Sequence, residues 1–390
     1  MRVKPDSWNP AAAGGMAVVP RYGASGRQLS VRHYVPGGRE DGGGIGRLVG
    51  YIVDTADGTG VRHLVTDTRG PNWFAPVSLL RLSSAMVAMA KDRLLVPGRI
   101  HHIHVAGRGS TSRKLILTSV ARLLGCVHVL HLHDYDYAAD FAARTPRGQR
   151  RVRAMFRGAD RVIALGERDR ATLESSVGVD RSRIEVVHNC VPDPGARPIR
   201  VAQTPLIVFL GRLSERKGVP ELLSALASPV LAGLQWQAVI AGDGPVEAYR
   251  RHAAQLGLSG RVEMPGWLDG GEARALCRRA DILVLPSHAE GMAMAVIEGL
   301  AHGLAVVTTR VGAHEEAIAD GETGLFVPVG DKDALAEALA MLIGDPVLRN
   351  SLSIKARLHY LSLFSMAAYQ HRLATFYEAI LREDQARVRA

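Results

Sequence analysis

The sequence predicts an α/β fold made of two doubly wound parallel-sheet domains. Short apolar runs, typical of strands buried on both faces, alternate with stretches of helical periodicity along most of the chain. A proline-rich stretch between residues 192 and 205 separates two such series. The charge also divides there. Residues 1–200 hold 30 Lys and Arg against 17 Asp and Glu, a net charge of +13, whereas the remaining residues have a net charge of −3.

Length and cysteine usage limit the architecture further. A chain of 390 residues suggests two or three domains, and we expect a first domain at 28–192, a linker at 193–204, a second domain at 205–364 and a last helix at 365–385. Residues 1–27 are expected to be a disordered extension, with a signal peptide as the alternative. Three cysteines lack disulfide or metal spacing, which predicts a reducing, cytoplasmic location.

The first half opens with a strand at Leu29–Val35 and a glycine-rich loop at residues 42–47. A helix to about Thr55 and a strand at residues 61–66 complete a βαβ unit. Glycines let a phosphate or sugar approach the backbone closely, and this loop contains Gly42, Gly43, Gly44 and Gly46. A dinucleotide fingerprint is the alternative, but Val49 stands where that pattern requires its third glycine.

Histidines concentrate on two of the predicted strands. The strand at Ile100–Val105 carries three of them, and a polar loop then leads to a helix at residues 115–124. His131 and His133 share one face of the next strand, and His133 lies at the carboxyl end, where open parallel sheets bind ligands. Asp134 and Asp136 spell an Asp-x-Asp pattern. A metal site is therefore an alternative interpretation, but both patterns have low specificity.

A basic segment spans residues 144–157 and contains six arginines and no acidic residue. Its apolar residues, Val152, Met155 and Phe156, fall on one narrow side of a helix. We expect either a solvated helix or contact of the stretch from Arg147 to Arg157 with an anionic membrane, by electrostatics and shallow apolar insertion. Nucleic acid is not expected as a partner, because no stacking aromatic cluster or helix-turn-helix signal accompanies the charge.

The second half opens with a strand at Leu206–Leu210 followed by a turn and two cations. Gly211 allows the turn at the strand end, so that Arg212 and Lys217 come to the carboxyl edge of the sheet. Lysine is rare in this chain, which makes Lys217 in this place more informative than an ordinary surface charge. Two fixed cations beside a diphosphate would stabilise a departing nucleoside diphosphate.

A second strand, loop and helix unit follows at residues 281–302. A buried strand at 281–285 leads through Glu290 and Gly291 into a helix expected from Met292, with Glu298 near its middle. The first amides of a helix point outward unpaired and form an anion site. Two carboxylates beside such a site could bind the hydroxyls of a ligand whose phosphates rest on it. The alternative is that both glutamates face the solvent and cap the helix.

These motifs together resemble the retaining family-four glycosyltransferases of GT-B fold. The motifs that carry the resemblance are Gly211-Arg212 through Lys217-Gly218, the turn Gly242-Asp243-Gly244-Pro245, Glu290 and Glu298 in the pattern Glu-Gly-x6-Glu, and, in the first half, Gly43 to Arg47, His133 and His188-Asn189. The resemblance covers about residues 29 to 385. Cys190 departs from it, since many relatives have glycine there. The resemblance implies two Rossmann-like domains that face each other across a cleft.

The resemblance also implies roles for individual residues. Arg212 and Lys217 would bind the donor diphosphate, Glu298 the ribose, and Glu290 the donor sugar. His133 would lie by the reacting centre, with His131 as the runner-up. Further contacts are expected from the donor-binding residues Gly242, Trp267, Leu268, Gly291, Met292 and Ala293 and from the loop residues Gly43, Gly44 and Gly46, which would border the diphosphate and the acceptor. The family uses neither a metal nor another cofactor.

The expected reaction is transfer of a hexosyl group from a UDP- or GDP-sugar to a hydroxyl of a glycan or lipid-linked acceptor. Such an enzyme of bacterial cell-surface polysaccharide or glycolipid assembly would be cytoplasmic or peripheral at the inner face of the membrane. Two alternatives remain. One is a sugar-nucleotide epimerase or phosphorylase of the same architecture, and the other is a non-enzymatic basic binding protein.

Overall fold

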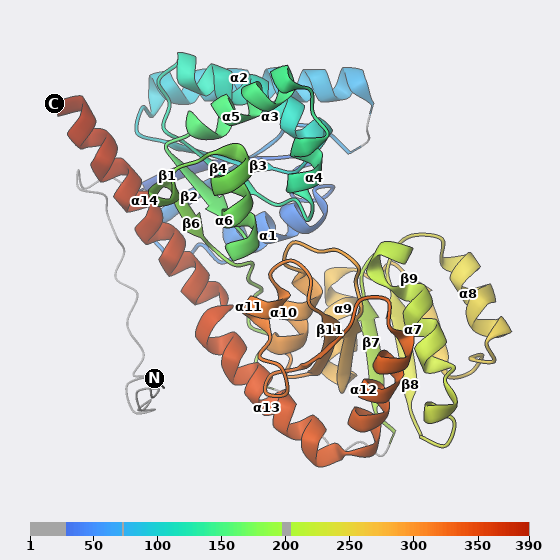
Figure 1. Cartoon of the computed structure of the whole chain (residues 1–390). Coiled ribbons are helices and arrows are strands. Elements are labelled where there is room, and N and C mark those ends of the chain that lie inside the picture. Colours follow the sequence, from blue (N-terminus) through green and yellow to red (C-terminus); the bar gives the residue numbers. More distant parts are fainter. Residues whose placement is uncertain (1–28, 72–73, 197–203, 390) are drawn as a thin grey trace, which may run out of the picture.

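A computed structural model of the chain describes residues 29–71, 74–196 and 204–389 (Figure 1). The expected extension at 1–27 lies outside these ranges, as does most of the expected linker at 193–204. No helix in the described ranges is both long enough and apolar enough to cross a membrane.

Two six-stranded sheets, each parallel throughout, frame two lobes. The first sheet has the order β2-β1-β3-β4-β5-β6, with β1 Leu29–Val35, β2 Val61–Asp67, β3 Ile100–Val105, β4 His128–Leu132, β5 Arg161–Ala164 and β6 Ile184–Val186. The second has the order β12-β11-β10-β7-β8-β9, with β7 Leu206–Leu210, β8 Gln237–Ala241, β9 Val262–Gly266, β10 Ile282–Leu285, β11 Ala305–Thr309 and β12 Leu325–Val327. The predicted pair of doubly wound sheets is confirmed.

Helices cover both faces of each sheet (Figure 1). Those of the first lobe are α1 Gly43–Asp54, α2 Ala75–Leu95, α3 Gly109–Leu123, α4 Tyr137–Ala142, α5 Pro146–Arg157 and α6 Glu167–Thr172. Those of the second lobe are α7 Val219–Leu226, α8 Val246–Gln255, α9 Gly270–Arg279, α10 Met294–Ala301, α11 His314–Ala317, α12 Lys332–Gly344 and α13 Pro346–Leu363. Short 3-10 or π turns lie at Leu173–Val177, Arg181–Arg183, Glu215–Lys217 and Pro229–Leu231.

The last helix, α14 Met366–Arg389, returns from the second lobe to the first (Figure 1). Its apolar residues recur at helical spacing, and Tyr369, Leu373, Tyr377 and Ile380 are buried in one cluster with Val31 of β1. The helix therefore covers one face of the first sheet and ties the two lobes together.

Helix starts are where the sequence prediction was wrong. The loop predicted before residue 115 is the first part of α3, because its polar side chains bond inward: Thr111 donates to the carbonyl of Ala106, and the buried ammonium of Lys114 donates to Thr68 Oγ1 at 2.7 Å. The glycine-rich loop is likewise the first turn of α1, which starts at Gly43. Conversely, α10 starts at Met294, two residues later than expected.

The apolar side of the basic helix α5 faces the protein and not the solvent. Val152, Met155 and Phe156 are buried in the core of the first lobe, so the predicted apolar insertion of these residues into a membrane is wrong. Thr145 caps the helix by accepting from the amide of Gly148. The arginines remain on the outer side.

Candidate active site

A cleft of about 640 Å³ lies between the lobes, where the carboxyl ends of both sets of strands meet. The first lobe contributes its lining through the start of α1 and the ends of β4 and β5, and the second through the ends of β7, β8 and β10. Nearly all of the predicted site residues line it: His133, Glu290, Arg212, Lys217, Gly242, Trp267, Leu268, Gly291, Met292, Ala293, Glu298, Gly43 and Gly44.

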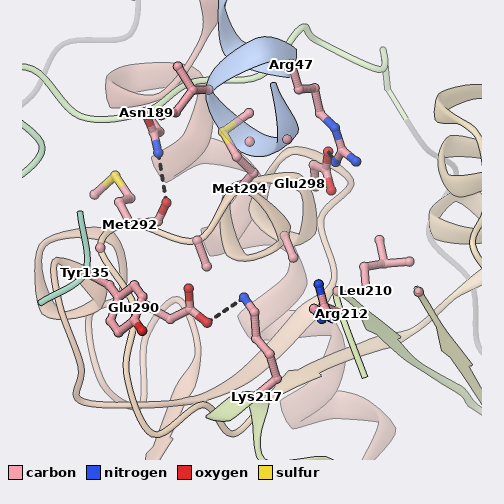
Figure 2. Close-up of a pocket in the computed structure, with 18 of the residues that line it drawn as sticks. Arg47, Tyr135, Asn189, Leu210, Arg212, Lys217, Glu290, Met292, Met294 and Glu298 are labelled. Carbon is pink, nitrogen blue, oxygen red and sulfur yellow. Dashed lines mark hydrogen bonds and ion pairs between the residues drawn. The ribbon is translucent and has the colours of Figure 1, made fainter. Parts of the chain in front are cut away.

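A buried carboxylate with two cations occupies one wall of the cleft. Lys217 lies at the end of a single 3-10 turn after β7, and its Nζ lies 2.5 Å from Oε1 of Glu290 (Figure 2). Arg216 Nη1 lies 3.4 Å from the same oxygen and donates to the carbonyl of Ala289 at 2.6 Å. Glu290 is 7% exposed, so this charge is almost fully removed from water and needs both cations.

Arg212 differs from its neighbours because its guanidinium is exposed to solvent. Its side chain is 67% exposed and makes only a loose contact, 3.8 Å, with the carboxylate of Asp243. The residue lies directly after Gly211, whose carbonyl oxygen would be only 1.7 Å from a Cβ at Gly242. Glycine at 242 therefore lets the ends of β7 and β8 approach each other and brings Arg212 to the rim of the cleft.

Glu298 is the second carboxylate of the cleft and comes from the first turns of α10. Burial raises its pKa, and the guanidinium of Arg47 acts in the opposite direction, with Nη1 at 3.2 Å from Oε1 (Figure 2). Arg47 belongs to α1 of the first lobe, so this ion pair spans the two lobes. A half-buried carboxylate next to one cation can accept hydrogen bonds from a pair of ligand hydroxyls.

The segment from Gly291 to Ala293 leads through a bend into α10. Asn189 fixes it from the other side of the cleft, because its Nδ2 donates to the carbonyl of Met292 at 2.8 Å (Figure 2). Since Ala293 is the residue that caps the helix, these amides lie before its first turn and not within it as predicted. They still precede the positive end of α10, which favours an anion nearby.

His133 lines the cleft, whereas its predicted runner-up does not. His131 is fully buried behind it, in a face of the first sheet that contains several other histidines. Burial lowers the pKa of His133 to about 3, so its imidazole is neutral near pH 7. Nε2 of His133 is hydrogen-bonded to Nδ1 of His104 at 2.9 Å, which orients the ring.

Besides His131, Gly46 is the one predicted site residue that does not line the cleft. It is buried under the preceding loop, where a Cβ would lie 2.6 Å from the carbonyl oxygen of Gly38. This glycine therefore serves close packing of the loop on α1 and not ligand contact. Gly44 has open space around it and remains part of the lining.

A second, smaller cavity of about 440 Å³ adjoins the cleft in the first lobe. It shares His133 and Tyr135 with the cleft and also contains Asp134, Asp136 and Arg108. The amide of Asp136 donates to Asp134 Oδ1 at 2.9 Å, so the Asp-x-Asp pattern forms a local turn. Arg108 has φ +57 and is the one residue other than glycine with positive φ among those described.

Comparison with known proteins assigns the chain to a family. Residues 197–359 match the model of the glycosyl transferases group 1, and residues 47–193 match that of glycosyltransferase family 4. The chain is a member of the glycosyltransferases. LpsE, a lipopolysaccharide core biosynthesis glycosyltransferase of Rhizobium meliloti, is 30% identical over 220 residues, which are 56% of this chain and 54% of LpsE. The chain thus spans about half the length of that relative.

Solved structures of low sequence identity share the fold of this glycosyltransferase. Sucrose-phosphate synthase of Thermosynechococcus elongatus superposes with a TM-score of 0.73 at 19% identity, over 91% of this chain and all of that one. Anabaena HepE, solved in complex with UDP, superposes with a TM-score of 0.71 at 18% identity, over 90% of this chain and 100% of that one. The GT-B fold expected from the motifs is confirmed.

Several residues of the glycosyltransferase cleft had no assigned role in the sequence prediction. Arg216 precedes Lys217, yet nothing in the local pattern distinguished it from a surface arginine. Its guanidinium lies 4.7 Å from the ring centre of Tyr135 in the first lobe, a contact that depends on how the lobes meet. Asn189 was visible in the His188-Asn189 pair but had no expected partner. Its contact with Met292 explains its place in the motif.

Proposed function

We propose that this glycosyltransferase moves a hexosyl group from a nucleoside-diphosphate sugar to a hydroxyl of a lipid-linked or polysaccharide acceptor, with retention of the anomeric configuration. One observation carries the proposal: Lys217, Arg216, Arg212, Glu290 and Glu298 converge on one interlobe cleft. HepE, which shares the fold, is described in complex with UDP, and LpsE acts in lipopolysaccharide core biosynthesis. Both support this donor and acceptor class.

The donor would bind mainly to the second lobe. Arg212 and Lys217 would hold the diphosphate, and Glu298 would accept hydrogen bonds from the ribose hydroxyls. The base would lie beside Trp267, whose side chain is 66% exposed at the cleft, together with Leu268 and Gly242. The donor sugar would lie between Glu290 and His133.

The mechanism would rest on electrostatic stabilisation of the leaving group. Cleavage of the sugar–phosphate bond places negative charge on the diphosphate, next to Lys217, Arg212 and the positive end of α10. One such contact is commonly worth about 3 kcal/mol. The acceptor hydroxyl would attack from the face that the phosphate leaves, and a phosphate oxygen would take its proton. Because side chains supply these cations, we propose that the transfer itself needs no metal ion.

The acceptor would enter from the first lobe. The smaller cavity at Asp134 and Arg108 adjoins the cleft at His133 and Tyr135. A neutral His133 could accept or donate one hydrogen bond to a sugar hydroxyl. Gly43 and Gly44, with no Cβ at the start of α1, leave space for the reacting groups.

The test is transfer by the purified chain from a panel of UDP- and GDP-sugars. Thermal-shift and calorimetric binding would select the donor, and NMR of the product would give the anomeric configuration. We expect one donor to bind and the product to keep the configuration of the donor. Free isomerised sugar without transfer would instead indicate an epimerase. Loss of sugar to inorganic phosphate would indicate a phosphorylase, and binding without turnover would indicate a basic binding protein.

We also propose peripheral contact with an anionic membrane, at the inner face of the cell membrane where a lipid-linked acceptor would be met. The exposed arginines of α5, including Arg147, Arg150, Arg151 and Arg157, supply positive charge. Apolar side chains are exposed on the adjoining helices: Leu80 and Leu94 of α2 are 70% and 81% exposed, and Leu123 of α3 is 85% exposed. Helices α2, α3 and α5 lie on the same side of the first lobe (Figure 1).

Vesicle sedimentation tests this contact. The chain should pellet with vesicles of phosphatidylglycerol and remain in solution with vesicles of phosphatidylcholine alone. Replacing Arg147, Arg150 and Arg151 by Gln should lower binding by up to about 100-fold, since each basic residue near the surface is worth about 1 kcal/mol, or about fivefold in affinity. Equal binding of the variant and the wild type would contradict the electrostatic contact.

A further inference from the structure

The face of the first sheet that α14 covers contains a connected set of histidine rings. Alternate side chains of a strand point to the same face of a sheet. On β1, β3 and β4 with the residue after it, this alternation places five histidines on the covered face: His33, His102, His104, His131 and His133. Four of these five are fully buried, and His133 reaches the cleft. The ring–ring contacts join them into one group, with ring centres 3.9 Å apart for His131 and His133.

The geometry points to a site for a divalent transition-metal ion, with Zn²⁺ as the reference ion, formed by His104, His131 and His133. One ring nitrogen of each lies within 4.8 Å of the others. Imidazole nitrogen suits zinc, copper and nickel, and three histidines plus one exchangeable ligand are a common zinc arrangement. This site is separate from the diphosphate-binding residues of the second lobe.

The decisive feature is a buried nitrogen that has no partner. His131 is fully buried, its Nδ1 is hydrogen-bonded to His102, and its Nε2 has no hydrogen-bond partner. An unpaired buried polar atom costs about 1–3 kcal/mol. A metal ion bound to Nε2 would remove that cost. The alternative set of His33, His102 and His104 lacks this feature, since both ring nitrogens of each already have a partner.

The surrounding hydrogen bonds fit the metal-bound state of two ligands. If His131 binds through Nε2, its Nδ1–H can donate to Nε2 of His102 at 3.1 Å, and Nδ1–H of His102 can donate to the oxygen of Tyr377 at 2.6 Å. If His104 binds through Nδ1, its Nε2–H can donate to His33 at 3.0 Å, which in turn can donate to His63 at 2.9 Å. Such outer hydrogen bonds fix the tautomer of metal-binding histidines.

The adjustment needed between two of the ligands, His104 and His133, is small. Nδ1 of His104 and Nε2 of His133 are 2.9 Å apart as a hydrogen-bonded pair. Two nitrogens on a tetrahedral zinc ion are about 3.3 Å apart, given zinc–nitrogen bonds of about 2.0–2.1 Å. The ion would therefore replace the proton between these two rings, and the two nitrogens would move apart by about 0.4 Å. His133 lines the cleft, which gives the ion its route of entry and an open fourth position for water.

Metal titration of the full chain, purified without a polyhistidine tag and treated with EDTA, tests the site. Zn²⁺ would be titrated against a chromophoric chelator, and Co²⁺ would be followed by its visible spectrum. We expect one ion per chain and the strong absorption of tetrahedral Co²⁺. His131→Gln and His133→Gln should each weaken binding by more than the 10–100-fold typical of losing an outer hydrogen-bond partner, and His33→Gln should fall within about that range.

The matched control is His101→Gln. His101 is buried on β3, the strand of His104, but it faces the opposite side of the sheet, where it contacts Tyr34. Its affinity should equal that of the wild type. The inference is overturned if the ligand variants bind as tightly as this control, which would indicate surface histidines. It is also overturned if X-ray absorption of the zinc-loaded wild type shows fewer than three imidazole ligands. The wild-type spectrum and His133→Gln, at the rim of the cleft, decide the matter if His131→Gln does not fold. None of these measurements requires transferase activity, so a failure here is separable from a failure of the proposed function.

Discussion

Acidification should destabilise this protein strongly, because its histidines are buried in neutral form. Burial lowers the pKa of His63 and of His101 to about 4, against an ordinary value of 6.5. Below pH 6.5 the unfolded chain binds protons at these positions and the folded chain does not. The free energy of unfolding therefore falls as the pH falls from 6.5 toward 4. At pH 7.5 this loss is absent.

The magnitude follows from the two pKa values. Between pH 7.5 and pH 5.0 each of the two histidines costs about 2 kcal/mol, or about 4 kcal/mol together. Asp169 acts in the opposite direction, because burial raises its pKa to about 7 and the folded chain therefore binds its proton first as the pH falls. Protonation of Asp169 raises the free energy of unfolding by about 2.5 kcal/mol over the same interval. Burial lowers the pKa of His33 and His102 as well, and both add to the loss. We expect a net loss of at least about 2 kcal/mol, a large part of a typical stability of 5–15 kcal/mol.

Urea unfolding followed by circular dichroism, in buffers containing EDTA at pH 7.5, 6.0 and 5.0, measures this loss. His63 lies at the outer end of the histidine series and is only half-buried, so His63→Gln should fold and should reduce the pH dependence by about 2 kcal/mol. His252→Gln, in the second lobe, is the control and should leave it unchanged. Equal midpoints at pH 7.5 and 5.0 for the wild type would refute the reasoning.

Three further predictions concern the cleft. Lys217→Ala should lower kcat by about 10²–10³-fold in a transfer assay, with Lys332→Ala as a control, because it removes a cation from the diphosphate site and leaves Glu290 less compensated. A rise in KM with kcat unchanged would contradict this. Glu298→Gln should weaken donor binding by calorimetry about tenfold, through loss of a charged acceptor for the ribose hydroxyls; unchanged affinity would remove Glu298 from the donor site. Gly242→Ala should lower the free energy of unfolding by more than about 2 kcal/mol, because its Cβ would meet the carbonyl oxygen of Gly211 at 1.7 Å. Gly233→Ala, with open space around it, is the control, and equal urea midpoints would contradict the expectation.

Strands could be predicted from the sequence because each is a short apolar run with a turn at its end. The predicted strand at residues 206–210 has the observed bounds of β7, and Gly211 and Arg212 follow it as expected. Helix starts could not be predicted as well. Ser110 and Lys114 look like loop residues. Lys114 is nevertheless buried, and its ammonium donates to the carbonyl of Tyr34 on β1, a tertiary effect with no local signal. Helix α2 was missed, since its exposed leucines obscure the amphipathic pattern.

The site was predictable to the extent that its residues follow strand ends. Arg212, Lys217 and Glu290 each lie just beyond a strand of the same parallel sheet, so topology alone brings them to one edge. Contacts between the lobes could not be predicted from strand ends in this way. The pairing of Arg47 with Glu298 joins residues 251 positions apart, on helices of different lobes, and it depends on how the two lobes face each other.

The charges of the cleft are paired with one another in the structure, and this has a consequence for donor binding. Lys217 and Arg216 neutralise the buried Glu290, and Arg47 of the first lobe neutralises Glu298. A diphosphate that takes Lys217 as its partner leaves Glu290 dependent on Arg216 and on sugar hydroxyls. A ribose that takes Glu298 competes with Arg47 and so weakens one link between the lobes. Glu316 maintains another link between the lobes by accepting hydrogen bonds from His188 and from the amide of Glu167. Donor binding would therefore weaken the Arg47–Glu298 link while the links made by Glu316 and Asn189 hold, which is the condition for a hinge between the lobes.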